Sequence, residues 1–146
     1  MKATKFDERQ VLERGKVFFH GIIAAIILLL GNAVLQDSGK IWASGFIQNI
    51  TILFAIITVI TVEMVFRDVY FGYGKPNREL LMTLIFGICA LIIFGFALKD
   101  LGSGEALIVN GTFTEKGEHL PYAVLSLIIA VSLAIKAIRK PRSTEE

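Results

Sequence analysis

Four long stretches of this chain carry almost no charge, and they decide which folds are open to it. The stretches cover residues 17–35, 41–62, 80–98 and 121–135, and apart from His20 they hold no acidic or basic residue. A helix needs about 20 predominantly apolar residues to cross ~30 Å of hydrocarbon. The fourth stretch reaches that length if it continues past Lys136, whose amine can extend to the headgroups. We therefore predict an all-α fold, a bundle of four transmembrane helices.

The predicted organisation is a single integral membrane domain over residues 1–146. Residues 1–16 are expected to form a cytoplasmic juxtamembrane helix, and residues 99–119 an extracellular loop. The spans are expected at about 17–35, 43–66, 79–98 and 120–138, and the tail at 139–146.

The distribution of lysine and arginine predicts how the chain is threaded. Of the fifteen such residues, only Lys40, Lys99 and Lys116 lie in the loops after the first and third spans. The other twelve lie before the first span, between the second and third, and after the fourth. Because short loops rich in these residues stay cytoplasmic, both termini are expected inside.

The composition of the chain also excludes several classes of function. Hydrophobic residues make up 54% of the chain and charged residues 19%, whereas soluble domains are nearer a quarter charged. The single cysteine, Cys89, allows no internal disulfide and no cysteine-pair redox chemistry. No phosphate-binding loop, metal-ligand spacing or catalytic constellation is found. We expect a non-enzymatic protein without a cofactor. The cationic residues flank membrane spans, so we expect lipid and not nucleic acid as their partner.

Ionisable residues near the cytoplasmic membrane surface are the candidate functional residues. His20, Glu63 and Lys136 lie within about one helical turn of that surface and could meet in one cluster. Glu63 and Arg67 are four residues apart, which favours a same-face ion pair. Such residues either anchor the helices or contact a lipid headgroup or a partner. The candidate contacts are Asp7, Glu8, Arg9, His20, Glu63, Arg67, Asp68 and Lys136.

Polar residues along the second span form a second candidate feature. Ser44, Gln48, Thr51 and Thr58 fall on one helical face. These side chains either join the helices by hydrogen bonds and close packing or line a polar pathway through the bundle. The first interpretation is favoured because hydroxyls can bond carbonyls of their own helix.

Three local patterns carry further expectations. Thr4 and Asp7 are typical of a capping box, which opens a helix that runs or bends into the first span near Gly15. Two glycines, Gly72 and Gly74, are expected to end the second helix. The dipeptide at 110–111, Asn-Gly, predicts a β-hairpin in the extracellular loop.

The segments "DERQ" at residues 7–10 and "EMVFRDVYFGYG" at residues 63–74 resemble a group of small uncharacterised four-helix membrane proteins of Gram-positive bacteria. These domain-of-unknown-function families carry an amino-terminal Asp-Glu-Arg motif. The matching positions are Asp7, Glu8, Arg9, Arg67 and Asp68. The resemblance implies a bacterial plasma membrane and an accessory or regulatory role, and it carries over no catalytic residue.

Together these patterns lead to one leading expectation about function. We expect an accessory or regulatory subunit that binds a partner through its cytoplasmic face, which comprises residues 7–14 with Glu63, Arg67 and Asp68. The alternative is a small oligomeric transporter or channel. The sequence leaves open whether the partner is another protein or a second copy of the chain.

Overall fold

A computed structural model describes residues 7–70 and 76–139, which form four helices and two short strands. The elements are α1 (Glu8–Asp37), α2 (Gly45–Phe66), α3 (Pro76–Gly102), β1 (Ile108–Val109), β2 (Thr112–Phe113) and α4 (His119–Arg139). All four helices are long and apolar enough to cross a membrane, which confirms that prediction. The antiparallel strands are two residues long, and Asn110 and Gly111 between them have φ values of 51° and 81°.

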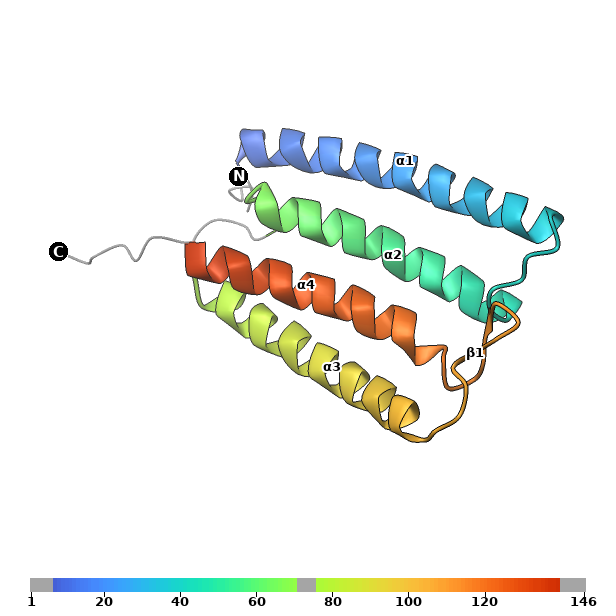
Figure 1. Cartoon of the computed structure of the whole chain (residues 1–146). Coiled ribbons are helices and arrows are strands. Elements are labelled where there is room, and N and C mark those ends of the chain that lie inside the picture. Colours follow the sequence, from blue (N-terminus) through green and yellow to red (C-terminus); the bar gives the residue numbers. More distant parts are fainter. Residues whose placement is uncertain (1–6, 71–75, 140–146) are drawn as a thin grey trace.

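The helices lie in an open row (Figure 1). Within the described residues α1 contacts α2, α2 contacts α4, and α4 contacts α3, and no other helix pair meets. The row therefore runs α1, α2, α4, α3, with one helix neighbour for each edge helix. The start of α1 and the ends of α2 and α4 lie together at one end of the helix axes, and we call this the termini end. The opposite end, which carries β1 and β2, is the sheet end.

Small residues line the contacts between neighbouring helices. Ala90 and Ala97 of α3 are buried, as are Ala123 and Ser126 of α4. Between α1 and α2 the buried small residue is Gly21 of α1, which packs against Ile60 of α2. Lipid is as apolar as leucine, so close backbone approach at small residues gives the dispersion contacts that associate membrane helices.

The first helix begins at a different cap from the one expected, and of the two expected courses near Gly15 it takes the unbroken one. Asp7 is its N-cap, and the Asp7 carboxylate accepts a hydrogen bond from the Arg9 amide at 2.9 Å. Thr4, expected to open a capping box, lies outside the described residues. The helix then runs unbroken through Gly15 for 30 residues. At ~1.5 Å per residue it measures about 45 Å, roughly 15 Å more than the hydrocarbon thickness.

The second helix ends earlier than its glycines suggest. It stops at Phe66, so the expectation that Gly72 and Gly74 end it was wrong, and both glycines lie outside the described residues. The Val69 amide donates to the Met64 carbonyl at 3.0 Å, and the Asp68 amide donates to the Val65 carbonyl at 3.4 Å. With Asp68 at φ 61°, this is a Schellman motif that has aspartate where glycine is usual.

Candidate functional site

The termini end of the row is organised around the turn formed by residues 67–69, directly after α2. Its apolar support is a buried cluster in which Val17 of α1 packs with Met64 and Val69. A Schellman motif is commonly accompanied by an apolar contact between its last residue, here Val69, and the last turn of the helix, here Met64. Because Val17 belongs to the same cluster, α1 is fixed against the turn as well as against α2.

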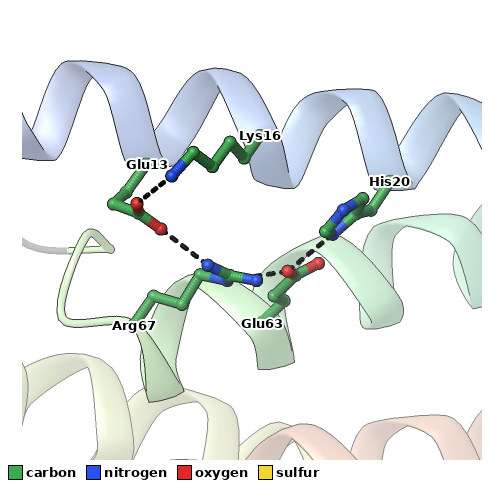
Figure 2. A network of polar contacts seen from close by, with 5 residues as sticks. All are labelled: Glu13, Lys16, His20, Glu63 and Arg67. Carbon is green, nitrogen blue, oxygen red and sulfur yellow. Dashed lines mark hydrogen bonds and ion pairs between the residues drawn. The ribbon is translucent and has the colours of Figure 1, made fainter.

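Two carboxylates and three nitrogen-bearing side chains form an ion-pair network across α1 and the end of α2 (Figure 2). Glu13 accepts from Lys16 Nζ and from Arg67 Nη1, both at 2.6 Å. Glu63 Oε1 accepts from Arg67 Nε at 2.7 Å and lies 2.8 Å from Nδ1 of His20. Arg67 thus bridges the two carboxylates, one from each helix.

Further side chains from both neighbouring helices hold the backbone of the turn. Gln10 Nε2 donates to the Asp68 carbonyl at 3.1 Å, and Arg14 Nη1 donates to the Val69 carbonyl at 3.5 Å. From the other side, Lys136 of α4 pairs with the Asp68 carboxylate at 2.5 Å. The turn is therefore the place where α1, α2 and α4 are connected by polar contacts.

The charges within the ion-pair network largely compensate one another. The hydrogen bonds to Glu13 and then to Glu63 raise the pKa of Arg67 above its ordinary value, so the guanidinium stays charged. The two carboxylates, Glu13 and Glu63, face two basic side chains, Lys16 and Arg67. Exposed ion pairs contribute little to stability. The network is thus suited to fixing the position of α1 against the turn, and it leaves no unpaired carboxylate in its interior.

The structure brings together some of the predicted site residues and separates others. His20, Glu63 and Arg67 meet as expected from their depth and spacing. In contrast, Lys136 joins Asp68 and does not reach Glu63, so the three residues expected in one cluster form two. Asp7 caps α1, while the side chains of Glu8 and Arg9 are exposed.

Sequence reasoning placed Gln10 and Glu13 in the cytoplasmic segment 7–14 but did not predict their contacts with the end of α2, and it did not single out Lys16. Gln10 and Arg14 continue the face of α1 that packs its Val17 and Gly21 against α2, at spacings of four and three residues. Extending that face toward the amino terminus would have placed Gln10, Glu13 and Arg14 beside the end of α2.

The opposite face of the same α1 segment is exposed and partly apolar. Val11 is 56% exposed and Leu12 is 69% exposed. They lie between two charged dipeptides, Glu8–Arg9 and Glu13–Arg14, in a part of α1 that we expect outside the hydrocarbon because of those charges. We call residues 8–14 the α1 extension. Its inner face is held by the turn, and its outer face presents two large aliphatic side chains.

The polar stripe of α2 is largely satisfied within the protein. Gln48 is 1% exposed, accepts from Gln36 Nε2 at 2.5 Å and donates to the Ala43 carbonyl at 2.8 Å. Thr58 donates to the Phe54 carbonyl of its own helix at 2.8 Å, and Ser44 donates to Glu118 at 3.4 Å. The buried hydroxyl of Thr51 has no hydrogen-bond partner among the described residues. These contacts support the interpretation that the stripe joins elements of the row.

Among the described residues, no group of three or more histidine, cysteine, aspartate or glutamate side chains could hold a metal ion. Comparisons with protein-family models, with curated proteins and with solved structures find no match to this chain.

Proposed function

We propose that this protein is a non-enzymatic accessory or regulatory subunit that binds a membrane-protein partner through the α1 extension. The observation that carries the proposal is the pair of exposed aliphatic side chains, Val11 and Leu12, on a charged helical segment that we expect outside the hydrocarbon. Apolar side chains that face lipid need no partner, whereas an exposed apolar patch rimmed by charged residues is typical of an interaction site.

The contacts that hold the inner face of the extension support this proposal. The polar contacts of the extension with the turn of residues 67–69 hold the helix in place without using its outer face. A surface that is already ordered loses little conformational entropy on binding, so more of the contact energy remains as affinity. The exposed charges of Glu8 and Arg9 beside the aliphatic pair would orient the partner.

The proposed location is the plasma membrane of a bacterium, with both termini in the cytoplasm and the β1–β2 turn outside. The distribution of lysine and arginine supports this orientation. It makes the α1 extension a cytoplasmic surface, so the partner would present its docking segment on the cytoplasmic side.

The experiment is a purification of the tagged protein from its own host in mild detergent, with protein identification and a native mass of the complex. The test variant replaces Val11 and Leu12 with serine. Its matched control replaces Ile108 and Val109, two adjacent exposed aliphatic residues at the sheet end, with serine. Alanine at Glu63 or Arg67 is less informative because it would open the ion-pair network that positions the extension.

We expect a stoichiometric partner with the wild type and with the I108S/V109S control, and its loss with V11S/L12S. Thermal unfolding of both variants establishes that they keep the fold. A partner that V11S/L12S retains at the wild-type ratio would refute docking through the extension. Recovery of a homo-oligomer alone would refute the accessory role.

A further inference from the structure

The sheet end holds an open-sided cavity of about 530 Å³, and the proposed function makes no use of it. One wall is the segment that follows α1, and the other is the turn between β1 and β2. The lining residues are Leu35, Gly39, Lys40, Ile41, Trp42, Asn110, Gly111 and Thr112. Small-molecule sites commonly occupy roughly 300–1,000 Å³. The cavity thus has room for a headgroup-sized ligand.

Direct contacts fix the two walls of this cavity relative to each other. The Thr112 hydroxyl donates to the Ile41 carbonyl at 2.6 Å, and the Phe113 amide donates to the Trp42 carbonyl at 2.8 Å. The Trp42 indole also donates to Asn32 of α1 at 2.9 Å and packs edge-on against the Phe113 ring. The β1–β2 turn is therefore attached to the helical row, and the space between the two segments is part of the fold.

Two polar side chains that line the cavity have no hydrogen-bond or ion-pair partner among the described residues. These are the Lys40 amine and the Asn110 amide. The lining contains no acidic side chain, so the charge facing the cavity is positive. An ammonium group and an amide N–H are donors that match the oxygens of an anion.

The position of the cavity favours a lipid as the source of that anion. Because α1 ends at Asp37 and α2 begins at Gly45, the connecting segment lies where hydrocarbon gives way to headgroups. Leu35 and Ile41 add apolar surface to the lining, and tryptophan favours this level of a bilayer. A phospholipid combines a phosphate for Lys40 with glycerol and acyl groups for the apolar surface.

We propose that this cavity binds the phosphate-bearing headgroup of an anionic phospholipid, with Lys40 and Asn110 contacting the phosphate. The site lies at the opposite end of the molecule from the α1 extension, so its test does not depend on the proposed function.

Trp42 provides the measurement because it is the single tryptophan of the chain and lines the cavity. The full-length protein in mild detergent is titrated with dioctanoyl phosphatidylglycerol while Trp42 fluorescence is recorded. Parallel titrations use dioctanoyl phosphatidylcholine and inorganic phosphate. Lys40→Gln removes the cation. Lys99→Gln, in the last turn of α3 at the same end, is the matched control because it removes an equal charge outside the lining.

We expect a saturable response to phosphatidylglycerol whose midpoint rises at least about tenfold in K40Q, the effect of losing a hydrogen bond between two charged groups. K99Q should stay within about twofold of wild type. Asn110→Gly keeps the left-handed turn while removing the amide, and it should raise the midpoint as well. Equal increases of the midpoint in K40Q and K99Q would mean that general surface charge causes the response, and they would refute a lipid site in this cavity. An equal response to phosphatidylcholine, or one that inorganic phosphate reproduces, would overturn the assignment to an anionic lipid.

Discussion

The contact between α1 and α2 gives the most direct test of how the row is held together. A Cβ atom added to Gly21 would lie 2.6 Å from both Cγ1 and Cδ1 of Ile60. Carbon atoms at rest are about 3.5–4.0 Å apart, so the helices or Ile60 must move. Overpacking of this kind costs about 1–3 kcal/mol. The same substitution gains about 1 kcal/mol of helix propensity, since glycine is a poor helix former.

Gly31 separates these two effects because it lies on the same helix with nothing within 4 Å of the added Cβ. Gly31→Ala should show the propensity gain alone, so Gly21→Ala should be less stable than Gly31→Ala by about 1–3 kcal/mol. The assay is reversible unfolding of each variant by a denaturing detergent in mixed micelles, followed by far-ultraviolet circular dichroism. Ile60→Ala removes both crowded atoms, so combining it with Gly21→Ala should recover the overpacking cost as a coupling energy. Equal stabilities for the two alanine variants would refute the close approach of α1 and α2 at Gly21.

Two further outcomes are expected from the core of α2 and from the turn that follows it. Gln48→Leu should lower the free energy of unfolding by about 1 kcal/mol, because it leaves the buried Ala43 carbonyl without its hydrogen-bond donor. Thr58→Val should change the free energy of unfolding by less than about 0.5 kcal/mol, because the Thr58 hydroxyl bonds only a carbonyl of its own helix. A larger loss in the Thr58 variant would contradict this ranking. Burial raises the pKa of Tyr70 above its ordinary value of 10.0, so its phenolate should form at higher pH than an exposed tyrosine, as measured by the 295 nm absorbance that Tyr70→Phe removes. As the pH rises, the Tyr70 hydroxyl loses its proton in the unfolded chain before it does so in the folded protein, so the stability that Tyr70 contributes should fall above about pH 10. A titration of Tyr70 without this shift would contradict its burial.

The four helices could be predicted from the sequence, but their order in the row could not. Hydropathy reports how much of a segment avoids water, and hydrocarbon and protein satisfy that requirement equally well. Ala90 and Gly95 illustrate the limit. Both are small residues in the same apolar stretch, yet Ala90 is buried and Gly95 is exposed. The seven-residue spacing of Ala90 and Ala97 places both on one face of α3, but it does not say which helix meets that face.

The candidate site was predictable where contacts are local and unpredictable where they depend on a turn. The Glu63–Arg67 pair follows from helical spacing, and His20 follows from its depth in the first span. The Lys136–Asp68 pair forms at a turn in which Asp68 has a left-handed conformation, and the neighbouring residues in the sequence do not predict that conformation. The left-handed region is uncommon for residues other than glycine, although aspartate tolerates it better than most.

The order of helices in the row has a consequence for synthesis in the cell. The third helix leaves the ribosome before α4, yet among the described helices α4 is its sole neighbour. At roughly 5–20 residues per second, synthesis of residues 103–139 takes about 2–7 s. During that interval α3 has no helix of its own chain to join, and α2 exposes the side that α4 will cover. The nascent chain must therefore keep α3 apart from the first helix pair, within the insertion machinery or in lipid, until the last helix is inserted between α2 and α3.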